Sequence, residues 1–398
     1  MRSNATEFSV TGQWSDAFDE ARLQGWAEAL RARLGGRRVS LGLVFMVPAW
    51  FPHARQVLEI LQVHAQVPLL VGCSSGSLIT DGLELEEDAG LVLGLYHLPG
   101  AELKAFHFTQ AHVEEANGPA FWHLESGVTP EATQGWLVFL DPFHLDSERW
   151  LNGWNEAFPG LPVLGGCASG ENTEQLAQVY LNGEVYEEGG VAVAVGGALR
   201  LAGVISQGCT PIGETWTITK AEQNLIQEIA NRPAYQVLAE TFVQLPPEQQ
   251  KRAQHNLFIG LVGNEYQEEF HRGDFLVRNL LGGDPNSGVL AVGALPRPGQ
   301  TVQFQCRDAA AATEDLKLLL EQAREKFRGA TVYGGCLCSC NGRGHRFFGV
   351  PNHDAALVQQ YLGPLGLTGF FCNGEIGPVG AKNFVHGYTA SLALFMRK

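Results

Sequence analysis

The sequence predicts a mixed α/β protein of two domains, and three observations lead to this prediction. The chain has 398 residues, which is more than one hydrophobic core usually holds. Hydrophobic residues make up 45% of it and charged residues 17%, so there is enough apolar material for sizeable cores. Short apolar runs that indicate buried strands alternate with stretches of helical spacing, and part of this order occurs twice.

The first elements can be assigned from their apolar patterns. Apolar residues recur at helical spacing over residues 15–34, and Gly35-Gly36 follows as a stop signal. A buried strand is expected over 39–47, then a helix over 52–64 and a second buried strand over 67–73. The same order returns as strand 136–140, helix 146–158 and strand 161–167.

The two runs of elements match in sequence as well as in order. Residues 43–76 align without a gap on residues 137–170, with identities such as Leu43/Leu137 and Cys73/Cys167. Identical residues occupy 11 of the 34 aligned positions, whereas average composition would give about two or three. Apolar runs over 90–96 and 190–195 continue the copies. The N-terminal half therefore contains a duplicated β-α-β-β unit, in mixed sheets flanked by helices.

The C-terminal part has a different order. A helix is expected over 221–245, interrupted near Arg232-Pro233. The later elements are strands at 275–281, 289–294 and 301–306, helix 309–327, strand 331–340, helix 354–362, and strands 367–372 and 388–396. This β-β-β-α-β-α-β-β order gives three segments: an N-terminal helical extension (1–37), a duplicated α/β domain (38–220) and a C-terminal domain (221–398).

Charge and cysteine usage exclude several classes of protein. The net charge is −15 and there is no basic stripe, so a nucleic-acid partner is not expected. No apolar run approaches the length of about eighteen residues that a membrane-spanning helix needs. The polar start of the sequence does not resemble a signal peptide, and most of the eight cysteines lie in apolar runs. Free thiols in the reducing cytoplasm are therefore expected.

Polar turns follow both duplicated second strands. Ser74 and Ser75 follow the first of these strands, and Ser169 follows the second. Hydroxyls and free backbone N–H groups in such turns can form an anion-binding nest, although the same turns can simply end a strand. The Gly-Lys-Ser/Thr of a P-loop is absent, so nucleotide hydrolysis is not indicated.

The strongest candidate site lies at the exits of two C-terminal strands. Cys340 and Asn341 lead into Arg343, whose planar fork could bind a carboxylate, while Asn373 leads into Glu375, which could receive an ammonium group. Together they would suit a zwitterion such as an amino acid. They could equally pair with each other.

Two further residues, Asn383 and His386, precede the last strand. A pair of His386 with Cys340 or Cys372 is the one plausible nucleophile, which leaves a thiol-dependent hydrolase or transferase as the alternative function. Cys336, Cys338 and Cys340 would be about 6.8 Å apart per step along a strand, too far to share one ion, so no metal or other cofactor is expected.

In its motifs the chain resembles the FIST family, whose proteins combine an N-terminal and a C-terminal FIST domain. The resemblance is carried, in order, by residues 72–76, 165–170, 207–213, 277–280, 338–344, 369–378 and 386–389. It implies FIST N-terminal and C-terminal domains over 38–220 and 221–398. It also implies a non-enzymatic sensory protein that binds a small ligand, amino acids being among the proposed ligands. Since the two FIST halves fill the sequence, a separate signalling partner protein is expected.

Overall fold

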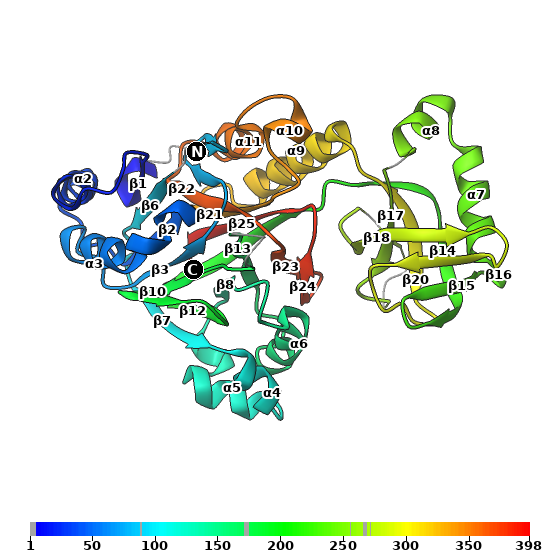
Figure 1. Cartoon of the computed structure of the whole chain (residues 1–398), viewed down its shortest axis with the longest axis horizontal. Helices are drawn as coiled ribbons and strands as arrows, with labels where there is room; N and C mark the ends of the chain where they lie inside the picture. The colour runs from blue at the N-terminus through cyan, green and yellow to red at the C-terminus, as the bar shows by residue number, and fades with distance from the viewer. Residues whose placement is uncertain (1–4, 88–89, 171–174, 255, 266–268, 271) are drawn as a thin grey trace. The chain divides into compact units, whose positions relative to one another are not determined.

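The chain folds into two compact units, which are described separately. The computed structural model describes residues 5–87, 90–170, 175–254, 256–265, 269–270 and 272–398 (Figure 1). One unit consists of Met1–Ile205 together with Lys317–Lys398, and the other of Ser206–Leu316. The predicted boundary at residue 220 lies inside strand β14 (Thr210–Glu222) of the second unit.

The first unit contains three six-stranded sheets built on one plan. The first sheet has the order β1 (Ser9–Trp14), β6 (Leu91–Tyr96), β2 (Leu41–Met46), β3 (Leu70–Ser74), β10 (Val179–Leu181), β11 (Glu184–Tyr186). The second has β7 (Ala101–Phe108), β12 (Gly190–Gly197), β8 (Trp136–Leu140), β9 (Val163–Cys167), β23 (Glu375–Val379), β24 (Lys382–His386). The third has β13 (Leu199–Ser206), β25 (Ala390–Arg397), β21 (Val332–Cys340), β22 (Leu367–Cys372), β4 (Leu78–Thr80), β5 (Leu83–Leu85).

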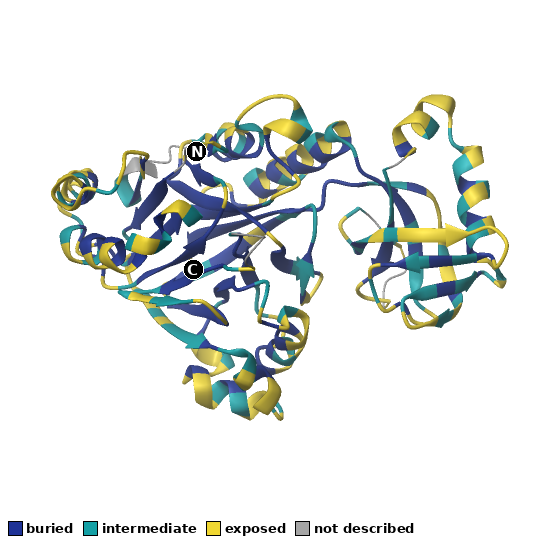
Figure 2. Cartoon of the chain, in the orientation of Figure 1, coloured by how far each residue is buried: buried dark blue, intermediate teal, exposed yellow. Residues whose placement is uncertain are grey.

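Each sheet is centred on a parallel pair of strands connected by a segment that contains a helix. The connecting helices are α3 (Ala54–His64) between β2 and β3, α6 (Ser147–Ala157) between β8 and β9, and α11 (His353–Leu362) between β21 and β22. Each of these helices buries one apolar face, and its outer face is exposed (Figure 2). The predicted duplication is confirmed, and the β21-α11-β22 segment adds a third copy that the sequence had not indicated.

The three repeats are held together by exchanged hairpins. Hairpin β4–β5 follows β3 in the chain but pairs with β22, β10–β11 follows β9 but pairs with β3, and β23–β24 follows β22 but pairs with β9. Equivalent backbone hydrogen bonds hold the beginning of each exchanged hairpin in place. The donors and acceptors are the Ser74 N–H and the Gln178 carbonyl (2.8 Å), the Cys167 N–H and the Gly374 carbonyl (2.7 Å), and the Phe371 N–H and the Ser77 carbonyl (3.0 Å). The carboxyl ends of β3, β9 and β22 are thereby brought to one place.

One glycine in each second strand allows the parallel pair to approach closely. A Cβ at Gly72, Gly165 or Gly369 would lie 1.7, 1.9 or 2.0 Å from the carbonyl oxygen of its partner on the first strand. These partners are Val44, Val138 and Leu337. The first strands of the two N-terminal copies therefore match at an offset of 94. The second strands match at 93, one residue from the gapless alignment, because Gly72 is equivalent to Gly165 and not to Gly166.

The remaining elements of the first unit lie around these sheets. They are α1 (Ala5–Phe8), α2 (Glu20–Ala32), η1 (Pro48–His53), α4 (Gln110–Glu115), α5 (Pro119–Ser126), η2 (Pro130–Ala132) and α10 (His345–Phe348). The predicted helical extension, residues 1–37, also contributes a strand. β1 pairs antiparallel with β6 along Ser9–Trp14, because this short segment completes the edge of the first sheet.

The second unit is an antiparallel barrel with two helices, α7 (Ala234–Gln244) and α8 (Pro247–Ala253). Its described strands pair in the order β14, β20 (Thr301–Cys306), β17 (Leu257–Val262), β18 (Phe275–Asp284), β19 (Val289–Val292), β15 (Leu225–Ile229), and β15 pairs with β14 to close the ring. β16 (Arg232–Pro233) pairs with β15. The next helix, α9 (Ala309–Lys326), spans the boundary between the two units.

The helix predicted over 221–245 is wrong in its first half. Residues 210–229 form the β14–β15 hairpin, which turns at Gln223 with a positive φ of 52°, and the helix begins at Ala234. Ile218, Ile226 and Ile229 are fully buried in the barrel core. Strand pairing and this burial outweigh the helical propensity of the Glu- and Gln-rich sequence.

Candidate functional site

The predicted serines meet where the three repeats join. The Ser75 and Ser169 hydroxyls both donate to the Phe371 carbonyl oxygen, at 2.7 and 2.8 Å, and the Ser74 hydroxyl donates to the Ser169 carbonyl at 2.9 Å. All three serines are buried. Their hydroxyls therefore connect one repeat to another.

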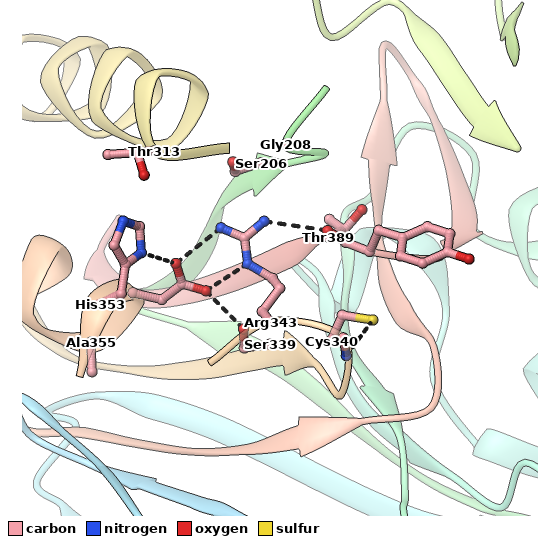
Figure 3. A network of polar contacts seen from close by, with 12 residues as sticks. Ser206, Gly208, Thr313, Ser339, Cys340, Arg343, His353, Ala355 and Thr389 are labelled. Atoms are coloured by element: carbon pink, nitrogen blue, oxygen red, sulfur yellow. Dashed lines mark hydrogen bonds and ion pairs between the residues drawn. The ribbon is translucent and has the colours of Figure 1, made fainter. Parts of the chain in front are cut away.

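Arg343 lies at the exit of β21 and is held by a buried carboxylate (Figure 3). Its Nε and Nη2 donate to the two carboxylate oxygens of Asp354 at 2.6 and 2.9 Å, and its Nη1 donates to the Tyr388 carbonyl at 3.3 Å. Both side chains are almost fully buried. Burial alone would raise the pKa of Asp354, but the Arg343 charge and the hydrogen bonds from His353 and Arg343 outweigh burial and hold that pKa below its usual range. The bidentate pair satisfies the charge of Arg343 within the protein.

Two neighbours support this ion pair. The Ser339 hydroxyl donates to Asp354 at 2.8 Å. The Glu84 carboxyl, on β5, accepts the backbone N–H groups of Asp354 and Ala355 at 2.7 and 2.9 Å, at the start of α11. Burial, followed by the nearby Asp354 charge, raises the pKa of Glu84 to about 7. Glu84 therefore joins the hairpin of the first repeat to the helix of the third.

Glu375 is the second charged candidate, and its environment differs from that of Arg343. It is fully buried at the start of β23, and its Oε2 accepts the Thr389 N–H at 2.9 Å. Burial raises the pKa of Glu375 to about 8, although Thr389, two thiols and the Arg343 charge act in the opposite direction. Arg343 is thus close enough to act on Glu375, but its ion pair is with Asp354. At neutral pH the Glu375 carboxyl is mostly protonated.

Two thiols share the Glu375 carboxyl. The Cys372 Sγ donates to Glu375 Oε1 at 3.2 Å, and the thiol of Cys340 also hydrogen-bonds to this carboxyl. Cys372 is completely buried, whereas Cys340 is partly exposed. The Cys340 sulfur also accepts the Gly342 N–H at 3.4 Å. Cys340 is therefore the more accessible of the two thiols that contact this carboxyl.

The exposed rim of the site consists of polar turn residues. Asn341 and Asn373 are exposed, and the Asn341 amide donates to the Asn373 side-chain oxygen at 2.8 Å. Tyr388 is partly exposed and adopts a positive φ of 65°, an unfavourable conformation for a tyrosine. A Cβ on Gly342 would lie 3.7 Å from both the Tyr388 ring and the Cys340 sulfur. Tyr388 is thus held beside the thiol.

The other two candidates make structural contacts. The Asn383 side chain accepts the Val163 N–H at 2.9 Å and donates to Asn155 at 2.8 Å, so it fastens β24 to β9 and α6. The His386 ring is buried and contacts the Gly377 carbonyl at 3.0 Å. The structure therefore brings Arg343, Glu375, Cys340, Asn341 and Asn373 to one edge, while Asn383 and His386 brace the neighbouring hairpin.

A separate cavity lies elsewhere in the first unit. It has a volume of about 450 Å³, and the residues along it include Phe51, Arg55, His107, Gln178 and Tyr186. It contains none of the predicted site residues. The His107 ring stacks on Tyr186 with 3.7 Å between centroids, and burial lowers the His107 pKa.

The structure adds four residues that the sequence analysis missed: Asp354, Glu84, Thr389 and Tyr388. Asp354 lies in the first turn of a predicted helix, where an acidic residue is common, so its pairing with Arg343 had no local signal. Glu84 lies in the acidic run Glu84-Leu-Glu-Glu-Asp88, and runs of this kind are most often solvated. The other two residues act through backbone groups or a backbone conformation, which a single sequence does not reveal.

Two features were not found among the described residues: a cluster of metal ligands and a membrane-spanning helix. In this part of the chain, no three His, Cys, Asp or Glu side chains are grouped as ligands for a metal ion. Among these same residues, no helix has both the length and the apolar character needed to cross a membrane.

Comparison with known proteins extends these findings. The chain is 36% identical to the uncharacterized protein Rv0628c of Mycobacterium tuberculosis, over 92% of this chain and 94% of that protein. It is 35% identical to the uncharacterized protein Mb0898c of Mycobacterium bovis over similar shares, 92% and 93%. A shorter match, 29% identical over 29% of this chain and 25% of the other, is to an F-box/LRR-repeat protein of Arabidopsis thaliana.

Two family models match consecutive parts of the sequence. The FIST N domain matches residues 40–232 and the FIST C domain matches residues 234–378. The two models together cover most of the chain, and FIST domains are generally considered sensory domains of signal transduction. The sheets and site described above therefore belong to a member of the FIST family.

Proposed function

We propose that this protein is a sensory protein whose ligand is an amino acid or a similar small zwitterion. The ligand binds at the edge formed by Cys340, Asn341 and Asn373, next to Glu375. We also propose that a separate partner protein receives the signal. The observation that supports the binding site is the state of Glu375: a buried carboxyl with a pKa of about 8, next to a partly exposed residue.

Arg343 and Glu375 differ in whether another charged side chain already neutralises them. Arg343 is closed off by Asp354, so it does not serve as the carboxylate receptor that the sequence suggested. Among the described residues Glu375 has no ion-pair partner, and burial, which raises its pKa to about 8, keeps it mostly neutral at pH 7. An ammonium group that reached it past Cys340 would favour the ionised form. The exposed amides of Asn341 and Asn373 supply N–H donors for the carboxylate of the ligand.

This arrangement predicts that binding releases a proton. At pH 7 the ligand's ammonium group would convert the neutral Glu375 carboxyl to a carboxylate, and the lost proton would pass to the buffer. Calorimetric titration with a panel of amino acids, in two buffers of different ionisation enthalpy, measures that proton directly. Glu375→Gln should abolish the proton release and weaken binding.

The matched control is Glu84→Gln. Glu84 is also a buried carboxyl with a raised pKa, but it accepts the backbone N–H groups of Asp354 and Ala355. The proton release should persist in this variant. If no amino acid binds, or if Glu375→Gln releases the same proton, the proposed site is wrong. Loss of binding in Tyr186→Ala with normal binding in Glu375→Gln would assign the ligand to the separate cavity instead.

One observation favours a second candidate function, that of a thiol-dependent hydrolase or transferase. The partly exposed Cys340 accepts the Gly342 N–H, and the group next to its thiol is the Glu375 carboxyl. In this version the Glu375 carboxyl is the polar group beside the reactive thiol. Selective alkylation of Cys340 that slows in Glu375→Gln would support it, and uniformly inert thiols would exclude it.

A further inference from the structure

We propose that Cys340 and Cys372 form an oxidisable pair, which hydrogen peroxide converts to a disulfide within the chain. Cys340 is the last residue of β21 and Cys372 the last residue of β22. The two strands are adjacent and parallel, and these two residues are direct partners in their register. The proposal does not depend on the identity of the sensed ligand.

The geometry places the two sulfurs within reach of each other. Neighbouring strands lie about 4.8 Å apart, which falls inside the Cα separation of roughly 4.4–6.8 Å that a disulfide requires. Both thiols also hydrogen-bond to the single carboxyl of Glu375, Cys372 at 3.2 Å. Two sulfurs that contact one carboxyl group have converged on the same side of the sheet. We expect a change of side-chain rotamer to bring them into bonding distance.

The pair has unequal access to solvent, which assigns each thiol a role. Cys340 is partly exposed, so an oxidant meets it first, and its sulfur accepts the Gly342 N–H at 3.4 Å. Cys372 is completely buried and lies directly behind it. Cys73, Cys336 and Cys338 are also buried, in the core of the first unit. Cys340 is therefore the attacking thiol and Cys372 the resolving one.

The chemistry balances with hydrogen peroxide as the oxidant. The Cys340 thiolate attacks one peroxide oxygen, the O–O bond breaks, and Cys340 sulfenic acid and hydroxide form. The Cys372 sulfur then attacks the Cys340 sulfur, the S–O bond breaks, and the second hydroxide leaves. The Cys372 proton is transferred to that hydroxide, and the proton that Cys340 lost on forming its thiolate neutralises the first hydroxide. Overall, two thiols and one peroxide give one disulfide and two waters.

The experiment is peptide mapping after the full-length protein has been treated with peroxide. Trypsin should release residues 329–343 and 347–382 as separate peptides, since Arg328, Arg343, Arg346 and Lys382 delimit them. After oxidation the two peptides should be joined, with the loss of two hydrogens. Fragmentation of the joined peptides should assign the bond to Cys340, because Cys336 and Cys338 lie on the same peptide.

Single substitutions distinguish the oxidation of Cys340 from the later attack of Cys372. Cys372→Ser should trap the sulfenic acid, so a dimedone label accumulates on Cys340, while the wild type shows little label and a disulfide. Cys340→Ser should lose both products. Cys167→Ser is the matched control, because that buried thiol also lies near Glu375 and Cys372, and it should behave as the wild type.

Three results would overturn the proposal. In the first, Cys340 of the wild type keeps a stable dimedone label and no disulfide forms. In the second, Cys372 is joined to Cys167 instead. In the third, Cys372 is oxidised as fast in Cys340→Ser as in the wild type. Since the readout is covalent and needs no ligand, failure here leaves the proposed ligand site to be judged by its own titration.

Discussion

The carboxyl ends of β3 and β9, in the first two repeats, and of β22, in the third, are equivalent places in the fold. The residues at these strand ends nevertheless differ in chemistry. By strand register, Ser75, Ala168 and Cys372 are equivalent positions. In the first two repeats the serines donate to backbone carbonyls and join one repeat to the next. In the third the same edge carries the thiols, Glu375 and the Arg343–Asp354 pair. The same backbone arrangement therefore carries serines that join the repeats at two strand ends, and ionisable side chains at the third.

Removing one partner of the buried ion pair should have the largest effect on stability. Asp354→Ala leaves the Arg343 guanidinium buried without its counter-charge, and we expect a loss of about 3–5 kcal/mol in the free energy of unfolding. Urea denaturation measures this. The double variant Arg343→Met with Asp354→Leu should recover most of the loss, since neither charge remains. A cost below about 1 kcal/mol for Asp354→Ala would mean that the pair is far more hydrated than its burial indicates.

The pH dependence of stability should report Glu375. Its folded pKa is raised to about 8 from an unfolded value near 4.3, so the folded state binds its proton more tightly. Its contribution to stability is complete below about pH 4.3 and is lost as the pH rises through 8, by up to about 1.4 kcal/mol per pH unit. Urea denaturation at several pH values should show this decline in the wild type and a weaker one in Glu375→Gln.

The decline that remains in Glu375→Gln should come from Glu84, whose pKa is raised to about 7 and whose contribution has the same sign. Glu84→Gln should therefore remove the part that ends near pH 7 and leave the part that extends to pH 8. An unchanged pH profile in Glu375→Gln would contradict the assignment of the neutral carboxyl to that residue.

Substitution of the serines where the repeats join should lower the free energy of unfolding by an intermediate amount. Ser75→Ala and Ser169→Ala each remove a hydrogen bond to the Phe371 carbonyl, for which we expect a loss of about 1 kcal/mol. Because either serine alone still satisfies that carbonyl, the double variant should cost more than the sum of the single variants. A double-mutant cycle measures this coupling. Strict additivity would argue against a shared acceptor, and ligand affinity should stay unchanged throughout.

The smallest effect on stability is expected at the exposed rim. Asn341→Ala and Asn373→Ala should change the free energy of unfolding by no more than about 0.5 kcal/mol, because both side chains are exposed. Their effect should appear as weaker binding of the amino acid in calorimetry. Normal affinity in the double variant would remove these amides from the proposed site and leave Glu375 alone to be tested.

Much of the fold was predictable because its elements have strong local patterns. The strands at 136–140, 301–306 and 367–372 agree with the predictions to the residue. The first and the third are continuous buried runs, and the second is mostly buried. The exchanged hairpins were missed because strands such as β4 and β10 have only three residues, too few to show an alternating pattern. The third repeat was missed because the barrel separates β13 from the rest of that repeat.

The candidate site was predictable only in part, for a similar reason. Arg343, Glu375 and Cys340 were named because polar groups that follow buried strands collect at one edge of a sheet. The partner of Arg343 could not be named, since Asp354 reaches it from α11. The start of α11 is in turn bound by Glu84, from the hairpin of another repeat. The sequence allowed Arg343 and Glu375 to pair with each other. In the structure the Arg343 charge is neutralised by Asp354 instead.

The sequence by itself determined the central strands of the sheets, the helices that connect them, the N-terminal duplication and the residue types at the strand ends, because these depend on periodicity and composition along the chain. The tertiary structure alone decided that three repeats exchange hairpins, that Asp354 neutralises Arg343 and that two thiols share Glu375. Such outcomes depend on contacts between residues far apart in sequence. They also depend on burial, which changes the charge of a carboxyl without changing the residue.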